Sequence, residues 1–243
     1  MSVFPIPAPA SDGRSRVAGI EAVFAWLRFG WTVFAAHPGL WAMSALILIA
    51  GLFVLMLVPL VGSSFAGLLT PILAAGLLAM CRQAAGEGKP GLSDLAAGFM
   101  TRPKPLAVLG VIFIIATLII KLAVFHLFSS LAGGLMTQGL AGLGILGGWI
   151  ILLLFSSLLL VPLWMVMCFA SALVLFNDMP PVEACKAGFA ASLKNILSFL
   201  ILGLIVFVLC FFAALPVGLG FLVLIPVLAG TAYASYQDVF LAH

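Results

Sequence analysis

Residues 102–128, RPKPLAVLGVIFIIATLIIKLAVFHLF, decide the class of this protein. Two basic residues are followed by an apolar run that contains a single full charge, Lys121, and about 20 such residues suffice for a helix to cross a bilayer. Of the 243 residues in the chain, 65% are hydrophobic and 7% are charged, whereas about 25% of the residues of a soluble domain are charged. The sequence therefore predicts an all-α integral membrane protein and excludes a soluble globular domain.

Several other stretches of the chain are also long and apolar enough to be membrane spans. Together with the first stretch, the predicted spans lie at roughly 39–60, 64–84, 105–128, 148–174, 195–214 and 217–237. Very short turns join the first two spans and the last two. We therefore predict a polytopic transmembrane helix bundle of about six spans.

The charged residues are confined to alternate loops. Nine of the ten Lys and Arg residues lie in three segments, and the turns at roughly 60–66, 129–147 and 214–218 carry no charge. The nine are Arg14, Arg16, Arg28, Arg82, Lys89, Arg102, Lys104, Lys186 and Lys194. Because basic residues near span ends are retained in the cytoplasm, both termini are predicted to be cytoplasmic. The segment 129–147 is then outside, as a re-entrant segment, an interfacial helix or a plain loop.

An internal repeat underlies this pattern. A shorter amphipathic piece precedes the first, third and fifth spans, and LSDLAAGFMTRPKP (92–105) aligns without gaps with VEACKAGFAASLKN (182–195). In the first piece, 19–41, the side chains of Phe24, Leu27 and Trp31 share one helical face, which favours a helix in the headgroup plane. We predict three copies of one unit, an interfacial helix followed by a transmembrane hairpin.

The second span of each hairpin contains a matching proline that is followed by a polar end. The prolines are Pro71, Pro162 and Pro226, and the polar ends are Cys81-Arg82-Gln83, Asn177-Asp178 and Tyr236-Gln237-Asp238. We interpret the prolines as packing devices, with hinges for gating as the alternative. The predicted organisation is one membrane domain, 17–243, preceded by a disordered cytoplasmic tail, 1–16, which is rich in Pro and Ala.

Five polar residues are candidates for function. Counted from Pro105 at 1.5 Å per residue, Lys121 lies about 24 Å along its helix, near the outer boundary, where its stem can snorkel. We interpret it as an anchoring lysine, and an anion or proton site with His126 is the alternative. Tyr233 and Tyr236 suit an aromatic belt. With Asp238, the alternative is a latch onto basic residues such as Lys104 or Lys194, or a ligand site.

The sequence contains no constellation for catalysis, metal binding or cofactor binding. The predicted spans hold no carboxylate, and the chain lacks the HExxH, GxSxG and P-loop spacings. The cysteines show no CxxC spacing, so we interpret them as inert thiols; they are Cys81, Cys168, Cys185 and Cys210. We predict a non-enzymatic protein without a cofactor.

A family resemblance rests on the AGF of the amphipathic pieces (97–99 and 187–189), the prolines of the second helices and the closing AYASYQDVF, 232–240. Together they resemble a widespread group of uncharacterised bacterial inner-membrane proteins. That group is similar to the membrane domain fused to some glycerophosphodiester phosphodiesterases. The resemblance covers most of residues 20–240 and implies an inner-membrane location. It implies no hydrolase activity, because the chain has no phosphodiesterase domain.

Two functional hypotheses follow. The first is a protein that organises or assists a membrane process through contacts with lipids, with a membrane-protein partner or with a second copy of itself. Anionic lipids are favoured because the basic residues flank the spans, and for the same reason the net charge of +3 does not indicate nucleic-acid binding. The rival is a small transporter or channel for a hydrophobic or weakly polar solute, which the recurring prolines and glycines motivate.

Overall fold

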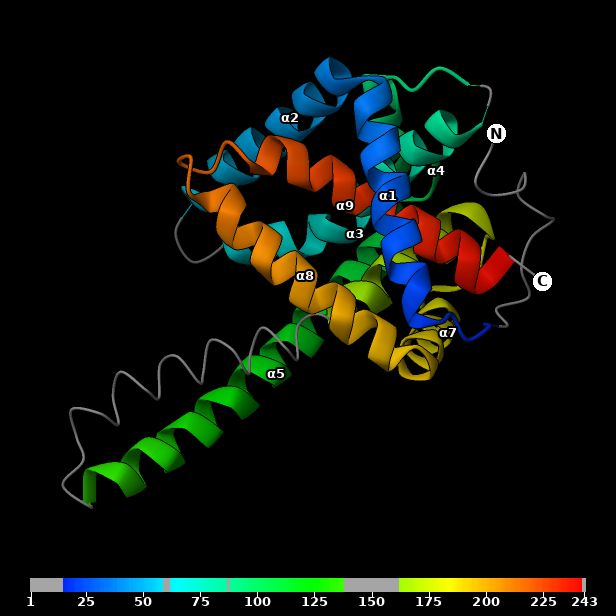
Figure 1. The fold of residues 1–243 in the computed structure, drawn as a ribbon. Helices are drawn as coiled ribbons and strands as arrows, with labels where there is room; N and C mark the ends of the chain where they lie inside the picture. The colour runs from blue at the N-terminus through cyan, green and yellow to red at the C-terminus, as the bar shows by residue number, and fades with distance from the viewer. Residues whose placement is uncertain (1–14, 59–61, 87, 138–161, 242–243) are drawn as a thin grey trace.

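The computed structural model describes residues 15–58, 62–86, 88–137 and 162–241, and every regular element in these ranges is helical (Figure 1). In chain order these are α1 (Ile20–Ala36), α2 (Pro38–Met56), α3 (Gly62–Ala85), the 3-10 turn η1 (Leu92–Ala96), α4 (Ala97–Thr101), α5 (Pro103–Thr137), an apolar helix Pro162–Phe176, α7 (Pro181–Lys194), α8 (Ile196–Ala214), α9 (Phe221–Tyr236) and the π-helical turn η2 (Gln237–Leu241). The predicted all-α membrane bundle is confirmed.

Four of the described helices are long and apolar enough to cross a membrane: α2, most of α3, α5 and α8. They coincide with the predicted spans at 39–60, 64–84, 105–128 and 195–214. The helix Pro162–Phe176 belongs to the predicted span 148–174, of which residues 148–161 lie outside the described residues. The count of six spans stays a prediction.

The last predicted span, 217–237, is shorter in the structure. Helix α9 has 16 residues and begins only at Phe221. The reason lies in the preceding turn, where Val217 and Gly218 have φ angles of 53° and 81°. Such left-handed backbone interrupts a right-handed helix. Residues 217–220, which the hydropathy pattern assigned to the span, therefore belong to the turn.

The predicted order of an amphipathic helix and then an apolar helix occurs three times. We call α1, the η1–α4 pair and α7 the collar helices, and each leads directly into a long apolar helix. The residues between them are all non-helical: His37 (φ −142°, ψ 63°), Arg102 (φ −140°, ψ 53°) and Asn195 (φ −112°, ψ 23°). A following proline disfavours α-helical backbone at His37 and Arg102. Each unit therefore starts with a sharp break between its collar helix and its first span.

Each collar helix packs closely against the second apolar helix of another unit. A methyl group on the collar glycine would contact or overlap a backbone carbonyl of that helix, and small residues of this kind let helix backbones approach. The pairs are Gly30 with Val227, Gly98 with Ile72 and Gly188 with Val166. Thus α4 packs on α3, α7 packs on Pro162–Phe176, and α1 packs on α9, so the first and last units are joined and the described units form a closed ring.

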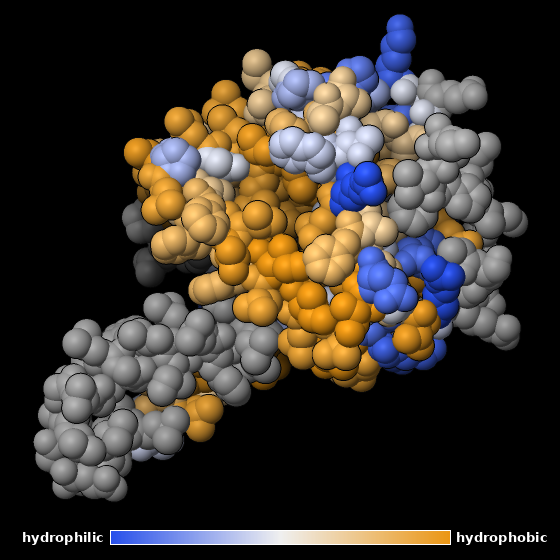
Figure 2. All heavy atoms as spheres, viewed as in Figure 1, coloured by the Kyte–Doolittle hydropathy of each residue, from blue (hydrophilic) through white to orange (hydrophobic). Residues whose placement is uncertain are grey.

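One end of the ring is polar. Figure 1 shows α1 running across the direction of α2, α8 and α9, with α4 and α7 on the same side of the molecule as α1. Figure 2 shows hydrophilic residues gathered on that side and apolar residues over α8. We call this side the polar end.

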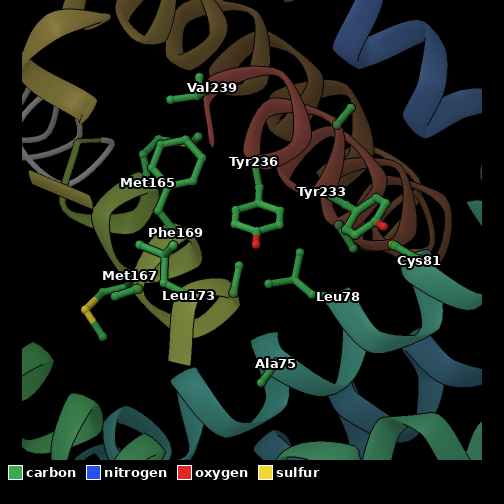
Figure 3. Packing of buried hydrophobic residues seen from close by; sticks show 14 of the residues in the cluster. Ala75, Leu78, Cys81, Met165, Met167, Phe169, Leu173, Tyr233, Tyr236 and Val239 are labelled. Carbon is green, nitrogen blue, oxygen red and sulfur yellow. The ribbon is translucent and has the colours of Figure 1, made fainter. Parts of the chain in front are cut away.

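Aromatic side chains form a shared core behind the polar end. Trp26, Phe169, Phe199 and Phe240 are buried. Ring centroids are separated by 5.8 Å for Trp26 and Phe199, by 5.6 Å for Phe169 and Phe199, and by 5.4 Å for Phe169 and Phe240. Figure 3 shows Phe169 and Tyr236 on facing helices of this core. Because the rings come from all three units, the core ties the units together.

Candidate functional site

A buried carboxylate marks the centre of the polar end. The side chain of Asp238, in η2, accepts hydrogen bonds from the guanidinium of Arg16 and from Nε1 of Trp26, the latter at 3.0 Å. The Asp238 side chain is 7% exposed, and a buried charge is tolerated only when it is paired and hydrogen-bonded. The carboxylate therefore depends on donors from the first unit, although it belongs to the third.

Residues 15–18, which we call the N-terminal strap, are held beside this carboxylate. The backbone N–H of Arg16 donates to the carbonyl of Val239 at 2.9 Å. The amide of Asn195 donates from Nδ2 to the Arg16 carbonyl (3.0 Å) and accepts at Oδ1 from the Ala18 N–H (2.6 Å). Ser15 and Arg16, the last two residues of the predicted tail 1–16, therefore belong to this strap. Residues 1–14 lie outside the described residues.

The polar ends of the second spans lie in contact with one another. The hydroxyl of Tyr236 donates to Oδ1 of Asn177. The guanidinium of Arg82 lies over the ring of Phe176, 5.0 Å from its centroid. These contacts connect the ends of α3, Pro162–Phe176 and α9 in one cluster.

An ion pair at the edge of the cluster fixes the turn after Phe176. Asp178 has φ 56°, in the left-handed region, which Asp tolerates better than most residues. Its carboxylate pairs with the guanidinium of Arg102, at the break between α4 and α5. The pair joins the second unit's collar helix to the end of the same unit.

Tyr233 lies deeper in the cluster. Its ring centroid is 6.3 Å from that of Phe29 in α1 and 6.3 Å from that of Phe176. The Gln237 side chain donates from Nε2 to the Tyr233 hydroxyl at 3.2 Å, while its Oε1 is buried without a hydrogen-bond partner in the described part of the chain. The tyrosine is thus more than a member of an aromatic belt.

The structure brings Tyr233 and Tyr236 together, with ring centroids 6.5 Å apart, whereas Asp238, in η2, contacts Arg16 and Trp26. A latch exists, but its partners differ from the predicted ones, Lys104 and Lys194. Lys194 instead donates from Nζ to the carbonyl of Ser15 at 3.3 Å. Arg16 and Trp26 are the donors at Asp238 instead, because the N-terminal strap is held beside the carboxylate by the bond from Arg16 N–H to the Val239 carbonyl.

Lys121 and His126 lie apart from this cluster. Both are exposed on α5, whose outer part projects away from the other labelled helices (Figure 1). Within the described residues neither side chain makes a hydrogen bond or an ion pair, and His126 lies beside the ring of its neighbour Phe125. The described structure therefore gives neither Lys121 nor His126 a hydrogen bond or an ion pair that would support an anion or proton site.

The described residues hold no group of three His, Cys, Asp or Glu side chains that could bind a metal ion. The four cysteines are free. Burial raises the pKa of the Cys185 thiol in α7, which lowers its reactivity. The absence of a cofactor and of catalysis stays a prediction.

The comparisons with known proteins point to a membrane location. Over 221 residues the chain is 28% identical to a protein of Burkholderia thailandensis named "Probable inner membrane protein", and the alignment covers 87% of this chain and 80% of that protein. No family model and no solved structure matches the chain. The chain is thus an all-α membrane protein that is similar, over most of its length, to a protein named for the inner membrane.

Proposed function

We propose that this protein is a non-enzymatic integral protein of the bacterial inner membrane that organises or assists a membrane process by holding lipids at its collar helices. The relative's name supports the location. The observation that carries the role is the composition of the outer face of the collar, which combines exposed aromatic side chains with basic ones.

Exposed aromatic residues occur on every collar helix. Phe24 and Trp31 of α1, Phe99 of α4 and Phe189 of α7 are between 44% and 60% exposed. The glycines of the same helices face inward against carbonyls of the apolar helices. Such helices lie in the membrane interface with the apolar side chains inserted among the lipids.

Basic residues accompany these aromatic side chains. Arg28 of α1, Lys104 at the start of α5, and Lys186 and Lys194 of α7 are exposed. Each basic residue near an anionic leaflet contributes about 1 kcal/mol of attraction. We therefore infer that the polar end faces the cytoplasmic leaflet, with six spans and both termini in the cytoplasm.

The finer family assignment belongs to the same proposal. We infer from the AGF segments and the closing AYASYQDVF that the chain is related to the membrane domain fused to some glycerophosphodiester phosphodiesterases. On this view the membrane domain that the two groups share provides a lipid-facing scaffold. The hydrolase activity belongs to the additional domain of the fused proteins.

Thermal unfolding of the protein in nanodiscs of graded anionic lipid content tests the proposal. We expect the unfolding temperature to rise with anionic content. A variant with Arg28→Gln, Lys186→Gln and Lys194→Gln should lose most of this rise, because its collar lacks three charges. Lys121→Gln, which removes one charge outside the collar, is the control and should respond as the wild type does. Equal stability in anionic and zwitterionic lipid would count against the proposal.

A transporter or channel for a weakly polar solute is the rival hypothesis. It needs a path between the units, whereas the described core behind the polar end is filled by Trp26, Phe169, Phe199 and Phe240. This packing favours the lipid-organising role. Solute flux into proteoliposomes that requires this protein would favour the rival.

A further inference from the structure

Three polar side chains at the polar end have hydrogen-bonding capacity that the described residues do not use. They are Arg82 at the end of α3, Tyr233 in α9 and Gln237 in η2. The ring of Phe176 contacts two of them, because the Arg82 guanidinium lies 5.0 Å from its centroid and the Tyr233 ring lies 6.3 Å from it, and Gln237 joins them through its hydrogen bond to the Tyr233 hydroxyl.

The guanidinium of Arg82 has no acidic partner among the described residues. Arg16 and Arg102 each pair with an aspartate, whereas Arg82 contacts the face of an aromatic ring. A cation–π contact does not use the five N–H donors of a guanidinium. The Arg82 side chain is also exposed, so its donors are available to a ligand. Arginine donors fit the oxygen atoms of a phosphate in bidentate fashion.

The Gln237 and Tyr233 side chains leave one acceptor and one donor unused. Oε1 of Gln237 is buried without a partner in the described structure, a situation that costs about 1–3 kcal/mol. The Tyr233 oxygen accepts from Gln237, so its own proton remains free to donate. Figure 3 shows the Tyr233 hydroxyl pointing toward Cys81, the residue before Arg82. The Tyr233 hydroxyl, to which the Gln237 side chain is bonded, therefore faces the end of α3.

We propose that Arg82, Tyr233 and Gln237 bind the phosphate-bearing headgroup of a membrane phospholipid. Arg82 and the Tyr233 hydroxyl donate to phosphate oxygens, and Oε1 of Gln237 accepts from a hydroxyl or ammonium group of the same headgroup. The proposal deepens the proposed function and rests on it, because it assigns one specific lipid site to the end of a span that terminates beside the collar.

Lipid binding to the purified, delipidated full chain in detergent tests this site. The probes are phosphatidylglycerol, oleate as an anionic amphiphile without phosphate, and inorganic phosphate. Half-saturation is read from the rise in unfolding temperature and, independently of stability, from the lipid adducts in native mass spectra. We expect Arg82→Gln to raise the half-saturating concentration of phosphatidylglycerol about tenfold and Tyr233→Phe to raise it about threefold. Lys121→Gln, with the same loss of charge outside the collar and away from this site, should behave as the wild type.

The outcomes separate the site from the general role. Wild-type affinity in Arg82→Gln, with a retained response of the protein to anionic bilayers, would overturn this site and leave the proposed function in place. Equal binding of oleate would overturn the phosphate assignment. Inorganic phosphate that binds as tightly as the lipid would make the ligand a free phosphate and overturn the lipid assignment. No response of the wild type to any anionic lipid would overturn the proposed function as well.

Discussion

The guanidinium of Arg16 and the carboxylate of Asp238 form an ion pair across 222 positions of the sequence. The indole of Trp26 completes the site by donating to the second carboxylate oxygen at 3.0 Å. Through these two contacts the last turn of the chain is fixed to the N-terminal strap and to the first collar helix.

Removal of the Asp238 carboxylate should destabilise the protein. In Asp238→Ala the buried Trp26 Nε1 loses its acceptor, and we expect a loss of about 1–3 kcal/mol. Arg16 contributes less, since its side chain is 46% exposed. Thermal unfolding in detergent measures the effect. Glu183→Ala, which removes an exposed carboxylate from α7, is the control and should change stability by less than about 0.5 kcal/mol. Equal effects of the two variants would refute the role assigned to Asp238.

The contact between α1 and α9 should not accommodate even one additional methyl group at Gly30. A Cβ at Gly30 would overlap the Val227 carbonyl, whereas a Cβ at Gly51 would have nothing within 4 Å. We expect Gly30→Ala to cost about 1–3 kcal/mol and Gly51→Ala to change stability by less than about 1 kcal/mol, in the stabilising direction. Unfolding temperatures of the two variants check this. If Gly30→Ala were as stable as Gly51→Ala, the close packing of the first and last units would be wrong.

The turn at Asp178 should tolerate asparagine but not valine. Asparagine adopts left-handed backbone and loses only an exposed ion pair, worth less than about 1 kcal/mol. A β-branched residue at φ 56° should cost about 1–2 kcal/mol more. The difference in unfolding temperature between Asp178→Asn and Asp178→Val measures the backbone effect alone. Indistinguishable variants would contradict it.

Alkylation of Cys185 should be slow and should depend on pH over an extended range. Burial raises the pKa of this thiol, and the thiolate is the reactive species. In a variant that keeps Cys185 as its single cysteine, the rate should still rise with pH above about 8.5, the usual thiol pKa. The unfolded variant should react faster at pH 8 and is the control. A rate that levels off near pH 8.5 in the folded protein would show that the thiol is not shielded.

Labelling of engineered cysteines should establish the orientation. In a cysteine-free background, Lys89→Cys, between α3 and η1, should react with a membrane-impermeant maleimide from the cytoplasmic side. Leu219→Cys, in the turn between α8 and α9, where Leu219 is 65% exposed, should react from the opposite side. Spheroplasts and inverted vesicles distinguish the two sides. Periplasmic labelling at position 89 would reverse the topology.

The sequence predicted the helical class, most span positions and the repeat, because these depend on local periodicity and length. It also placed Phe24 and Trp31 on one exposed face, and both are exposed. Leu27 of the same predicted face packs against the core instead, because α1 lies on α9 as well as at the surface.

The partners within the polar end could not be predicted. The composition of residues 1–16 indicated a tail, and no local pattern ties Arg16 to Val239 or to Asn195, its hydrogen-bond partners 179 positions or more away. Asp238 was a candidate for a latch, but the partners suggested for it were Lys104 and Lys194, whereas its partner Arg16 had been assigned to the tail. Such long-range pairs form only when the three units pack into the ring, so the sequence of a single unit does not predict them.

The packing of α1 on α9 has a consequence for biosynthesis. The surface of α1 around Gly30 is covered by α9, which follows the other α-helices of the described residues in the chain, so this surface stays uncovered until α9 has been translated. A product that stops before α9 would also leave Nε1 of Trp26 without its acceptor, the Asp238 carboxylate. Burial of the Gly30 surface of α1 thus has to follow the insertion of α9.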